Sequence, residues 1–265
     1  MAVFFKRIRQ KLLVKKRFGK YSLYALGEVL IVIVGILVAV QVNSWNEQRK
    51  NEAVEISVLK AIKADLIKDT LLLKEDMGLH LHSMLSSRIV QDYLANDRPY
   101  NDSLAHHFIA SFYVTDWMHN SGGIQTLKSL GVNTITDEKL RNEIIDLYDV
   151  KYNFLQYLTA SLTNNFLYIE QNILRTRFEQ ARLFFDYKES APFADDKESN
   201  SELVKWDERM IPLDYEALKN DHEYLFHLKT YMNEVHWYWF ICTDTENQMS
   251  QTILNLEQEI KSLEK

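Results

Sequence analysis

The sequence predicts an all-α protein in which one N-terminal transmembrane helix continues into an extracytoplasmic bundle of about four long helices with coiled-coil-like packing. The 265 residues include only 7 Gly and 3 Pro, far below the average share of roughly 7% and 5%, so turns are few and elements are long. Residues 21–42 are almost entirely apolar. Beyond them, apolar residues recur at spacings of three and four, as on one face of a helix.

The overall composition excludes several classes of protein. Hydrophobic residues make up 46% of the chain and charged residues 26%, values that exclude intrinsic disorder and allow a sizeable core. The scarcity of Gly and Pro argues against a turn-rich sandwich, barrel or propeller.

The charge is distributed unevenly along the chain. Residues 1–20 carry eight basic side chains and no acidic one, whereas residues 43–265 carry 23 basic and 36 acidic side chains, a net charge of −13. Apolar residues interleave with the basic ones in 1–20, as in an amphipathic helix on an anionic membrane surface. Contact with a cytoplasmic partner is the alternative for this tail.

The apolar run 21–42 is predicted to cross a membrane. A helix of that length is roughly 33 Å long, which matches a hydrocarbon core of about 30 Å. A cleaved signal peptide and a buried core helix are the alternatives. Lys20 and Trp45 are the expected interfacial anchors, and the positive-inside rule places the tail in the cytoplasm and residues 43–265 across the membrane.

One face of this predicted span carries little side-chain bulk. Gly27, Ile31, Gly35 and Ala39 recur every four residues, and small residues let membrane helices approach closely. Homodimerisation through this face is one expectation; the alternative is that Gly and Ala are simply common in membrane helices. Glu28 lies beside it, where an ionised carboxylate is costly. Pairing with a partner subunit, protonation and contact with the headgroups remain three alternatives for this residue.

The N-terminal residues resemble a known family. The similarity lies in Gly19-Lys20-Tyr21, Tyr24-Ala25-Leu26-Gly27-Glu28, Gly35-Ile36-Leu37 and Gln41-Val42-Asn43-Ser44-Trp45-Asn46-Glu47. These blocks resemble the start of an uncharacterised Bacteroidota family of single-span membrane proteins, a domain of unknown function. The similarity covers about residues 1–50, with a weaker match at 121–123 and 127–131. It implies a Gram-negative inner membrane with residues 43–265 in the periplasm, and no catalytic or binding residues.

Residues 43–265 are expected to form long helices with few breaks. The first continues from the span and ends near Asn96, with the buried stripe Leu59, Ile62, Leu66, Leu73, Met77, Leu81 and Met84. A second is expected over 102–117. Thr136 is a plausible N-cap for a third that ends near Phe185. Residues 186–213 have little periodicity and contain two of the three prolines, which predicts a long crossover connection or a mobile flap.

The last helix has the clearest periodicity, which predicts a coiled-coil-like seam inside the bundle or between subunits. The seam is Leu225, Leu228, Met232, Val235, Trp239, Cys242, Glu246, Met249, Ile253, Leu256, Ile260 and Leu263. Glu246 is its one polar residue, with solvent exposure at a bundle end or a role in register as alternatives. Cys242, the single cysteine, is expected to be a packed thiol, with an intermolecular disulfide as the alternative.

No motif assigns chemistry. His222, Glu223 and His227 have the wrong spacing for a zinc-protease helix, because the two histidines are five residues apart instead of four. No phosphate-binding loop, nucleophile elbow or C-x-x-C is present. No catalytic residue, metal ligand or cofactor is therefore predicted, and the acidic domain argues against nucleic acid as a partner.

The favoured function is a membrane-anchored periplasmic scaffold, sensor or accessory subunit. Its expected partners are the lipid bilayer and either a second copy of the chain or other envelope proteins. The alternative is an enzyme or a small-molecule or metal-binding domain whose site lies in the bundle core under residues 186–213.

Overall fold

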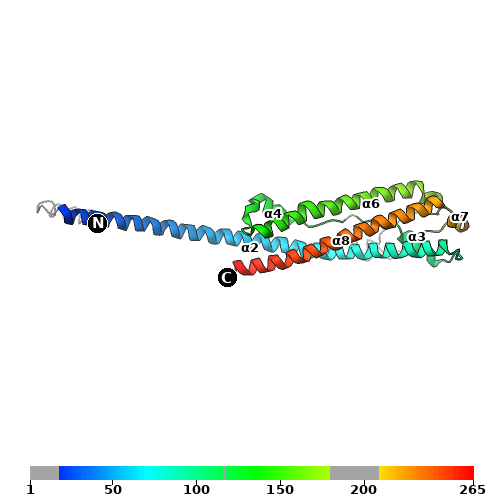
Figure 1. The fold of residues 1–265 in the computed structure, drawn as a ribbon, viewed down its shortest axis with the longest axis horizontal. Helices are drawn as coiled ribbons and strands as arrows, with labels where there is room; N and C mark the ends of the chain where they lie inside the picture. Colours follow the sequence, from blue (N-terminus) through cyan, green and yellow to red (C-terminus); the bar gives the residue numbers. More distant parts are fainter. Residues whose placement is uncertain (1–17, 116, 180–208) are drawn as a thin grey trace, which may run out of the picture. The chain divides into compact units, whose positions relative to one another are not determined.

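The computed structural model describes residues 18–115, 117–179 and 209–265, and these residues form helices and one isolated β-bridge. The predicted basic tail 1–20 falls almost entirely outside this part of the chain. The elements are α2 (Phe18–Ala95), α3 (Ser103–Ala110), α4 (Gly122–Leu130), η1 (Val132–Thr134), α5 (Glu138–Asp146), η2 (Leu147–Tyr152), α6 (Asn153–Asn172), η3 (Leu174–Thr176), α7 (Tyr215–Lys219) and α8 (His222–Leu263) (Figure 1). The chain divides into two compact units, the first ending at Ser57 and the second running from Val58 to Lys265.

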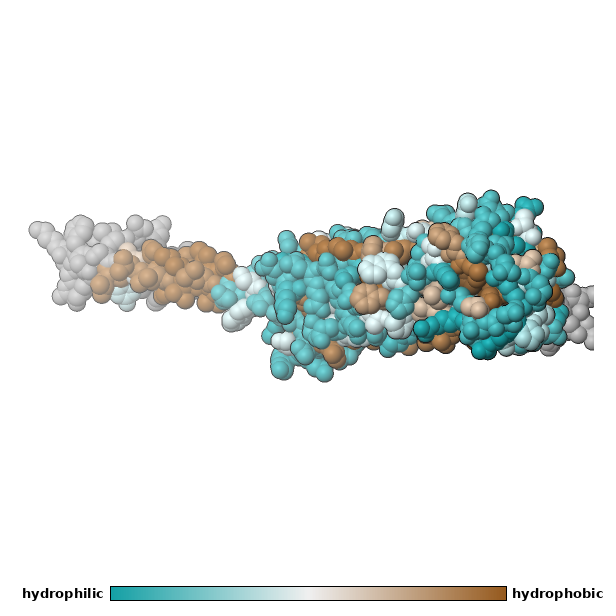
Figure 2. All heavy atoms as spheres, turned by 45° about the vertical axis from the view of Figure 1, so that its right-hand side comes forward, coloured by the Kyte–Doolittle hydropathy of each residue, from teal (hydrophilic) through white to brown (hydrophobic). Residues whose placement is uncertain are grey.

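The first unit contains the N-terminal part of α2. Its large apolar side chains from Leu23 to Val42 are all exposed, at 46% or more of their surface, and Figure 2 shows them as a continuous brown stretch. Within the described residues this is the one helix that is long and apolar enough to cross a membrane. The helix has no break between Phe18 and Ala95, as the absence of Gly and Pro from 36 to 77 predicts.

The second unit is built on three long helical stretches: α2 from Val58 onward, the run α5–η2–α6, and α8. Figure 1 shows them side by side, and α6, α5 and η2 all contact α8. Ion pairs join α2 to α8 at Lys60–Glu264, Lys63–Glu257 and Lys74–Glu246. Because residue numbers rise along α2 as they fall along α8, these two helices are antiparallel.

Three predicted helix boundaries differ from the structure. The helix expected over 102–117 ends at Ala110, and residues 111–115 and 117–121 have no regular structure. The helix expected to reach Phe185 ends at Asn172, because the chain turns and Phe178 bridges Pro212. The N-cap is Asp137 instead of Thr136, since the Asp137 side chain accepts a hydrogen bond from the Leu140 amide.

The buried stripe of α8 lies partly one residue away from the predicted seam. Six seam residues are buried and six are half-buried: Leu228, Val235, Cys242, Met249, Leu256 and Ile260 against Leu225, Met232, Trp239, Glu246, Ile253 and Leu263. Tyrosine and threonine take five alternate positions instead: Tyr224, Tyr231, Tyr238, Thr245 and Thr252. A buried tyrosine adds a large apolar ring to the core, provided that its hydroxyl finds a partner.

The same displacement occurs on α2. Its predicted stripe is buried at Leu59, Ile62, Leu66 and Leu73, but farther along the helix Met77 and Met84 are half-buried and Leu81 is exposed. Asp76, His80 and Ser83, each one residue earlier, are the buried residues. The middle of the second unit is therefore polar where hydrophobicity alone predicts an apolar interior.

Candidate functional site

The polar interior surrounds a stretch of chain that is not helical. Residues 111–115 and 117–121, here called the buried segment, connect α3 to α4. Ser111, Phe112, Tyr113 and Trp117 are buried, and Met118 is the only exposed residue among those described. A buried stretch without regular structure leaves backbone N–H and C=O groups that must find partners elsewhere.

Side chains of α2 and α8 supply partners for the backbone of this segment. The hydroxyls of Ser83 and Ser87 both donate to the carbonyl of Ser111, at 3.1 and 3.2 Å. The hydroxyl of Tyr231 donates to the carbonyl of Tyr113 at 2.8 Å. Because these groups are buried, each unmade bond would cost about 1–3 kcal/mol, which explains why serine and tyrosine occupy these core positions.

Asp76 joins the buried segment to both helices. Its Oδ1 accepts a hydrogen bond from the hydroxyl of Thr115, and its Oδ2 accepts one of 2.8 Å from the hydroxyl of Tyr238. His80, one turn along α2, lies with Nε2 3.6 Å from Oδ1 of Asp76. The carboxylate is therefore satisfied on both oxygens by hydroxyl groups of the same chain.

The geometry assigns the tautomer of His80. Its Nε2 is 3.3 Å from the Thr115 hydroxyl oxygen, whose single hydrogen already goes to Asp76. Nε2 must then be the donor, and in a neutral imidazole Nδ1 is an unprotonated acceptor. Nδ1 is buried with no hydrogen-bond partner among the described residues. The ring packs edge-on against Tyr113 and Tyr238, with centroids 5.4 and 4.8 Å apart.

Asp69 holds the other end of the buried segment. Its Oδ1 accepts hydrogen bonds from the backbone and side-chain nitrogens of Asn120, at 2.8 and 2.7 Å, and its Oδ2 accepts one of 3.1 Å from the hydroxyl of Tyr152. One turn earlier, Asp65 accepts a 2.7 Å bond from the amide of Gly123. Together, Asp69, Asp76, His80, Tyr152 and Tyr238 form what we call the polar core.

Gly123 lets α4 approach α2 closely. A Cβ on Gly123 would lie 2.6 Å from the backbone nitrogen and 2.8 Å from the Cα of Ile62. Real Cβ atoms do not approach backbone so closely, so any other residue would push the helices apart. A Cβ on Gly122 would meet only the Asp65 carboxylate, at an ordinary 3.7 Å.

Beside Asp69, a π-helical turn positions an aromatic cluster. Tyr148 and Tyr152 both belong to η2, a π-helix, an element that often occurs at functional sites. Their rings lie 4.9 Å apart, and Tyr152 also contacts Trp117 and His119, each at 4.8 Å. Trp117 Nε1, His119 Nδ1 and the Tyr148 hydroxyl are buried with no hydrogen-bond partner among the described residues.

Burial determines the protonation states of this region. Desolvation raises the pKa of Asp69, although the hydrogen bonds from Asn120 and Tyr152 oppose the shift. Desolvation also lowers the pKa of His80, against the attraction of Asp76. Burial raises the pKa of Tyr238 and, to about 12, that of the Cys242 thiol. His80 and Cys242 are thus neutral at pH 7.

The polar groups of this region hold the buried segment of the same chain in place. The oxygens of Asp69 and Asp76 accept hydrogen bonds from five side-chain or backbone groups of the second unit. Cys242 is a neutral buried thiol with none of the thiolate character that a nucleophile needs. Among the described residues, no group of three or more His, Cys, Asp or Glu side chains has the geometry to hold a metal ion.

The residues predicted for membrane packing belong to the first unit. Gly27 and Gly35 have no atom within 4 Å of a Cβ position. Glu28, Ile31 and Ala39 are exposed, and Trp45 is 59% exposed. Lys20 lies in the first turns of α2. The structure therefore groups these residues on a helix whose apolar surface is covered by no described part of the chain.

The predictions from sequence do not include the polar core, although the spacing of its residues along α2 indicates it. Asp69, Asp76, His80, Ser83 and Ser87 continue the three-and-four spacing of the apolar residues Leu59, Ile62 and Leu66. Polar residues that keep the register of a buried stripe indicate a core that contains hydrogen-bond partners. Their partners lie at 111–121 and in α8, too far along the chain for any local pattern to identify them.

One comparison with known proteins identifies a family. Residues 28–176 match the family described as a family of unknown function, DUF6090. The matched region includes Asp69, Asp76, His80, the buried segment and Tyr152, and it ends before α8. It overlaps the predicted similarity at residues 28–50 and at its weaker part, 121–123 and 127–131, and it covers much of the second unit. Neither a curated protein nor a solved structure matches the chain.

Proposed function

Because the chain belongs to DUF6090, a family of unknown function, we propose its function from its own residues: it is a single-span membrane protein whose helical domain acts through protein contacts, as a scaffold, a sensor or an accessory subunit. The observation that carries the proposal is the exposed apolar surface of α2 from Leu23 to Val42. In water such a surface is unfavourable, at about 25 cal/mol per Å², whereas in a bilayer it is solvated by lipid.

We assign residues 1–20 to the cytoplasm and residues 43–265 to the periplasm, with the inner membrane between them. The eight basic residues before the span and the net charge of −13 after it support this orientation. Trp45, exposed just beyond the apolar run, fits an interfacial anchor, and Lys20 fits the opposite one.

The polar core supports a binding role over catalysis. Its carboxylates and tyrosines, together with Ser83 and Ser87, are engaged in holding the buried segment. Desolvation shifts the pKa of His80 down and that of the Cys242 thiol up, so both groups are neutral. The alternative site under residues 186–213 lies mostly outside the described residues. The described end of that connection is held in place, since Met210 is buried and its amide donates to the Ala105 carbonyl at 3.0 Å.

Cysteine accessibility tests the orientation. Lys11→Cys places a thiol in the tail, and Asn51→Cys places one on an exposed position beyond the span. A membrane-impermeant maleimide, applied to cells with a permeabilised outer membrane, is expected to label Asn51→Cys at once and Lys11→Cys only after lysis. The wild-type chain is the control, because its single thiol, Cys242, is buried. Labelling of Lys11→Cys before lysis, or none of Asn51→Cys, contradicts the proposal.

A measurement of self-association through the span tests the proposal that the protein acts through protein contacts. We propose that Gly27, Ile31, Gly35 and Ala39 pack against a second copy, with Glu28 beside that face. Gly35→Leu adds bulk where a partner backbone would approach. The mass of the complex in mild detergent, measured by light scattering, is expected to fall from dimer to monomer. Val40→Leu, on the opposite face of the helix, is the matched control. A wild-type monomer would exclude this dimer.

A further inference from the structure

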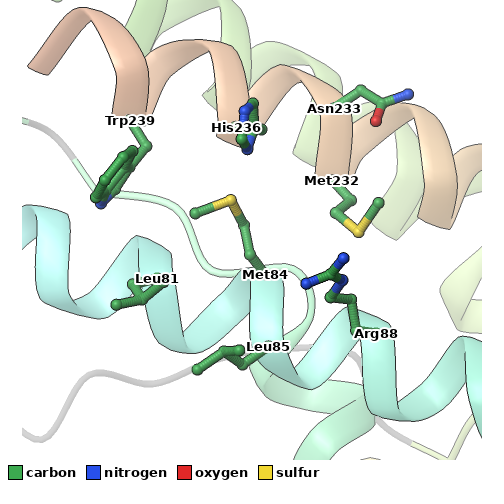
Figure 3. Close-up of a pocket in the computed structure, with 8 residues that line it drawn as sticks. All are labelled: Leu81, Met84, Leu85, Arg88, Met232, Asn233, His236 and Trp239. Atoms are coloured by element: carbon green, nitrogen blue, oxygen red, sulfur yellow. The ribbon is translucent and has the colours of Figure 1, made fainter. Parts of the chain in front are cut away.

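A pocket of about 410 Å³ opens between α2 and α8 in the second unit. Figure 3 shows its lining residues, which come in equal numbers from the two helices: Leu81, Met84, Leu85 and Arg88 from α2, and Met232, Asn233, His236 and Trp239 from α8. In this view Met84 points from α2 toward His236, while the Trp239 ring faces Leu81. A volume of this size, with mostly apolar walls and few polar groups, is typical of small-molecule sites.

The apolar walls of the pocket follow from the polar core. Asp76, His80 and Ser83 face inward on α2, so the apolar residues that follow them in sequence are turned toward the edge of the helix. On α8, Tyr231 and Tyr238 face inward and displace Met232 and Trp239 in the same way. The displaced residues of the two antiparallel helices meet at this pocket, which concentrates apolar surface outside the core.

Arg88 places a positive charge at this apolar surface. It is exposed and makes no hydrogen bond or ion pair within the part of the chain that the structure describes. Asp92, one turn farther along α2, already pairs with Arg98 at 2.9 Å. Figure 3 shows the Arg88 guanidinium beside Met232, directed between the two helices.

We propose that this pocket binds an anionic amphiphile, a molecule with an acyl chain joined to one carboxylate or phosphate group. The acyl chain lies against Leu81, Met84, Leu85, Met232 and Trp239, and the anionic group pairs with the Arg88 guanidinium, which suits planar carboxylates and phosphates. His236, exposed on the same wall, offers a second donor to that group. Two sources share this chemistry, a free fatty acid and an anionic phospholipid, and the proposal does not depend on the protein-contact function above.

Photo-crosslinking of the full chain in nanodiscs of zwitterionic lipid tests the proposal. Diazirine-bearing dodecanoate and diazirine-bearing phosphatidylglycerol are the anionic probes, and diazirine-bearing dodecanol is the neutral one. Labelled peptides are mapped by mass spectrometry. Both helix segments, 81–88 and 232–239, are expected to be labelled by at least one anionic probe, and about tenfold less by dodecanol, since a charge-assisted hydrogen bond contributes about that factor.

Variants separate the charge from the apolar surface. Arg88→Gln is expected to lower the labelling by the anionic probe about tenfold, to the level of dodecanol, while Arg88→Lys keeps most of it. Lys68→Gln removes another exposed cation of α2 and should leave the labelling unchanged. Met84→Trp fills the pocket and should abolish it, with circular dichroism confirming the fold. Labelling by dodecanol equal to that by both anionic probes, or labelling insensitive to Arg88→Gln, would overturn the proposal.

The two anionic arms identify the source. Labelling by dodecanoate alone indicates a free fatty acid, and labelling by phosphatidylglycerol alone indicates a lipid headgroup. Labelling by both probes supports an anionic amphiphile and shows that the pocket does not select between the two sources. Labelling by neither probe overturns the proposal.

Discussion

The hydroxyl of Tyr238 on α8 lies 2.8 Å from Oδ2 of Asp76 on α2 and donates a hydrogen bond to it. Both residues occupy core positions, at 1% and 7% exposure. A carboxylate at such a position is stable only while its oxygens are satisfied. This contact therefore links the two antiparallel helices through a group that neither helix could bury alone.

Tyr238→Phe is expected to destabilise the fold by about 1.5–3 kcal/mol, the range for removing a hydrogen bond to a charged group. Denaturant unfolding of the full chain in detergent, followed by circular dichroism, measures the change. Tyr168→Phe is the matched control, because Tyr168 is 51% exposed and should change stability by less than about 0.5 kcal/mol. Equal effects in the two variants would show that the Asp76 contact contributes nothing.

Tyr231→Phe is expected to cost less than Tyr238→Phe. Tyr231 donates to a neutral backbone carbonyl, that of Tyr113, and such bonds contribute about 0.5–1.5 kcal/mol. The same unfolding measurement gives the order of the two variants. A larger loss for Tyr231→Phe would mean that the backbone of the buried segment, instead of the Asp76 carboxylate, is the more sensitive part of the core.

Gly123→Ala and Gly122→Ala form a matched pair at the start of α4. Alanine at 123 would place its Cβ 2.6 Å from Ile62 N, so α4 must move away from α2, at a cost of about 1–3 kcal/mol. Alanine at 122 makes an ordinary 3.7 Å contact and should be neutral or slightly stabilising. Thermal unfolding distinguishes them, and similar midpoints would contradict the close approach.

Acidification is expected to destabilise the second unit through His80. Desolvation lowers its pKa below the ordinary 6.5, so the unfolded state takes up the proton first. The stability that this neutral histidine supports is present above about pH 6.5 and lost as the pH falls toward the folded pKa, at no more than about 1.4 kcal/mol per pH unit. Asp69 acts in the opposite sense, because its raised pKa favours the folded state at low pH.

Unfolding curves of wild type and His80→Gln between pH 7.5 and 5 test this prediction. Glutamine retains a donor toward Thr115 and cannot be protonated. The variant is expected to lose less stability than wild type over that interval, even though it starts from a lower value. Parallel curves would show that His80 does not carry the pH dependence.

Cys242 is expected to react only from the unfolded state. It is fully buried, and burial raises its pKa to about 12, so almost no thiolate exists at pH 8. Reaction with a chromogenic disulfide reagent should be slow in buffer and complete in denaturant. Tyr238→Phe should accelerate the slow reaction, because opening becomes easier. A fast reaction of the native wild type, or a disulfide-linked dimer on a non-reducing gel, contradicts the packed thiol.

Local patterns in the sequence predicted much of the fold. The scarcity of Gly and Pro predicted long helices, and α2 and α8 run for 78 and 42 residues. The end of the first helix was predicted near Asn96 and lies at Ala95. The all-helical class of the described residues is likewise confirmed, and so is the presence among them of one helix that is long and apolar enough to cross a membrane. These features depend on residues close together in sequence.

The candidate site was not predictable in the same way. Hydrophobic periodicity assigns Met232 and Trp239 to the core in preference to Tyr231 and Tyr238, since it ranks residues by their free energy of transfer alone. A tyrosine hydroxyl becomes acceptable inside only when an acceptor is present, and for Tyr238 the acceptor lies 162 residues away. No local pattern contains that information.

The sequence by itself determined most of where helices form and which stretch is long and apolar enough to cross a membrane, because backbone propensity and transfer free energy are local properties. Only the tertiary structure decided which face of each helix is buried. The non-helical residues 111–115 and 117–121 have backbone groups that must be satisfied inside the fold, and Ser83, Ser87, Asp69 and Tyr231 turn inward to satisfy them. Asp76 turns inward as well and accepts a hydrogen bond from the Thr115 hydroxyl. Because these polar side chains are buried, the buried faces of α2 and α8 are partly shifted by one residue from those that hydrophobicity predicts. Leu81, Met84 and Trp239 therefore line the pocket beside Arg88.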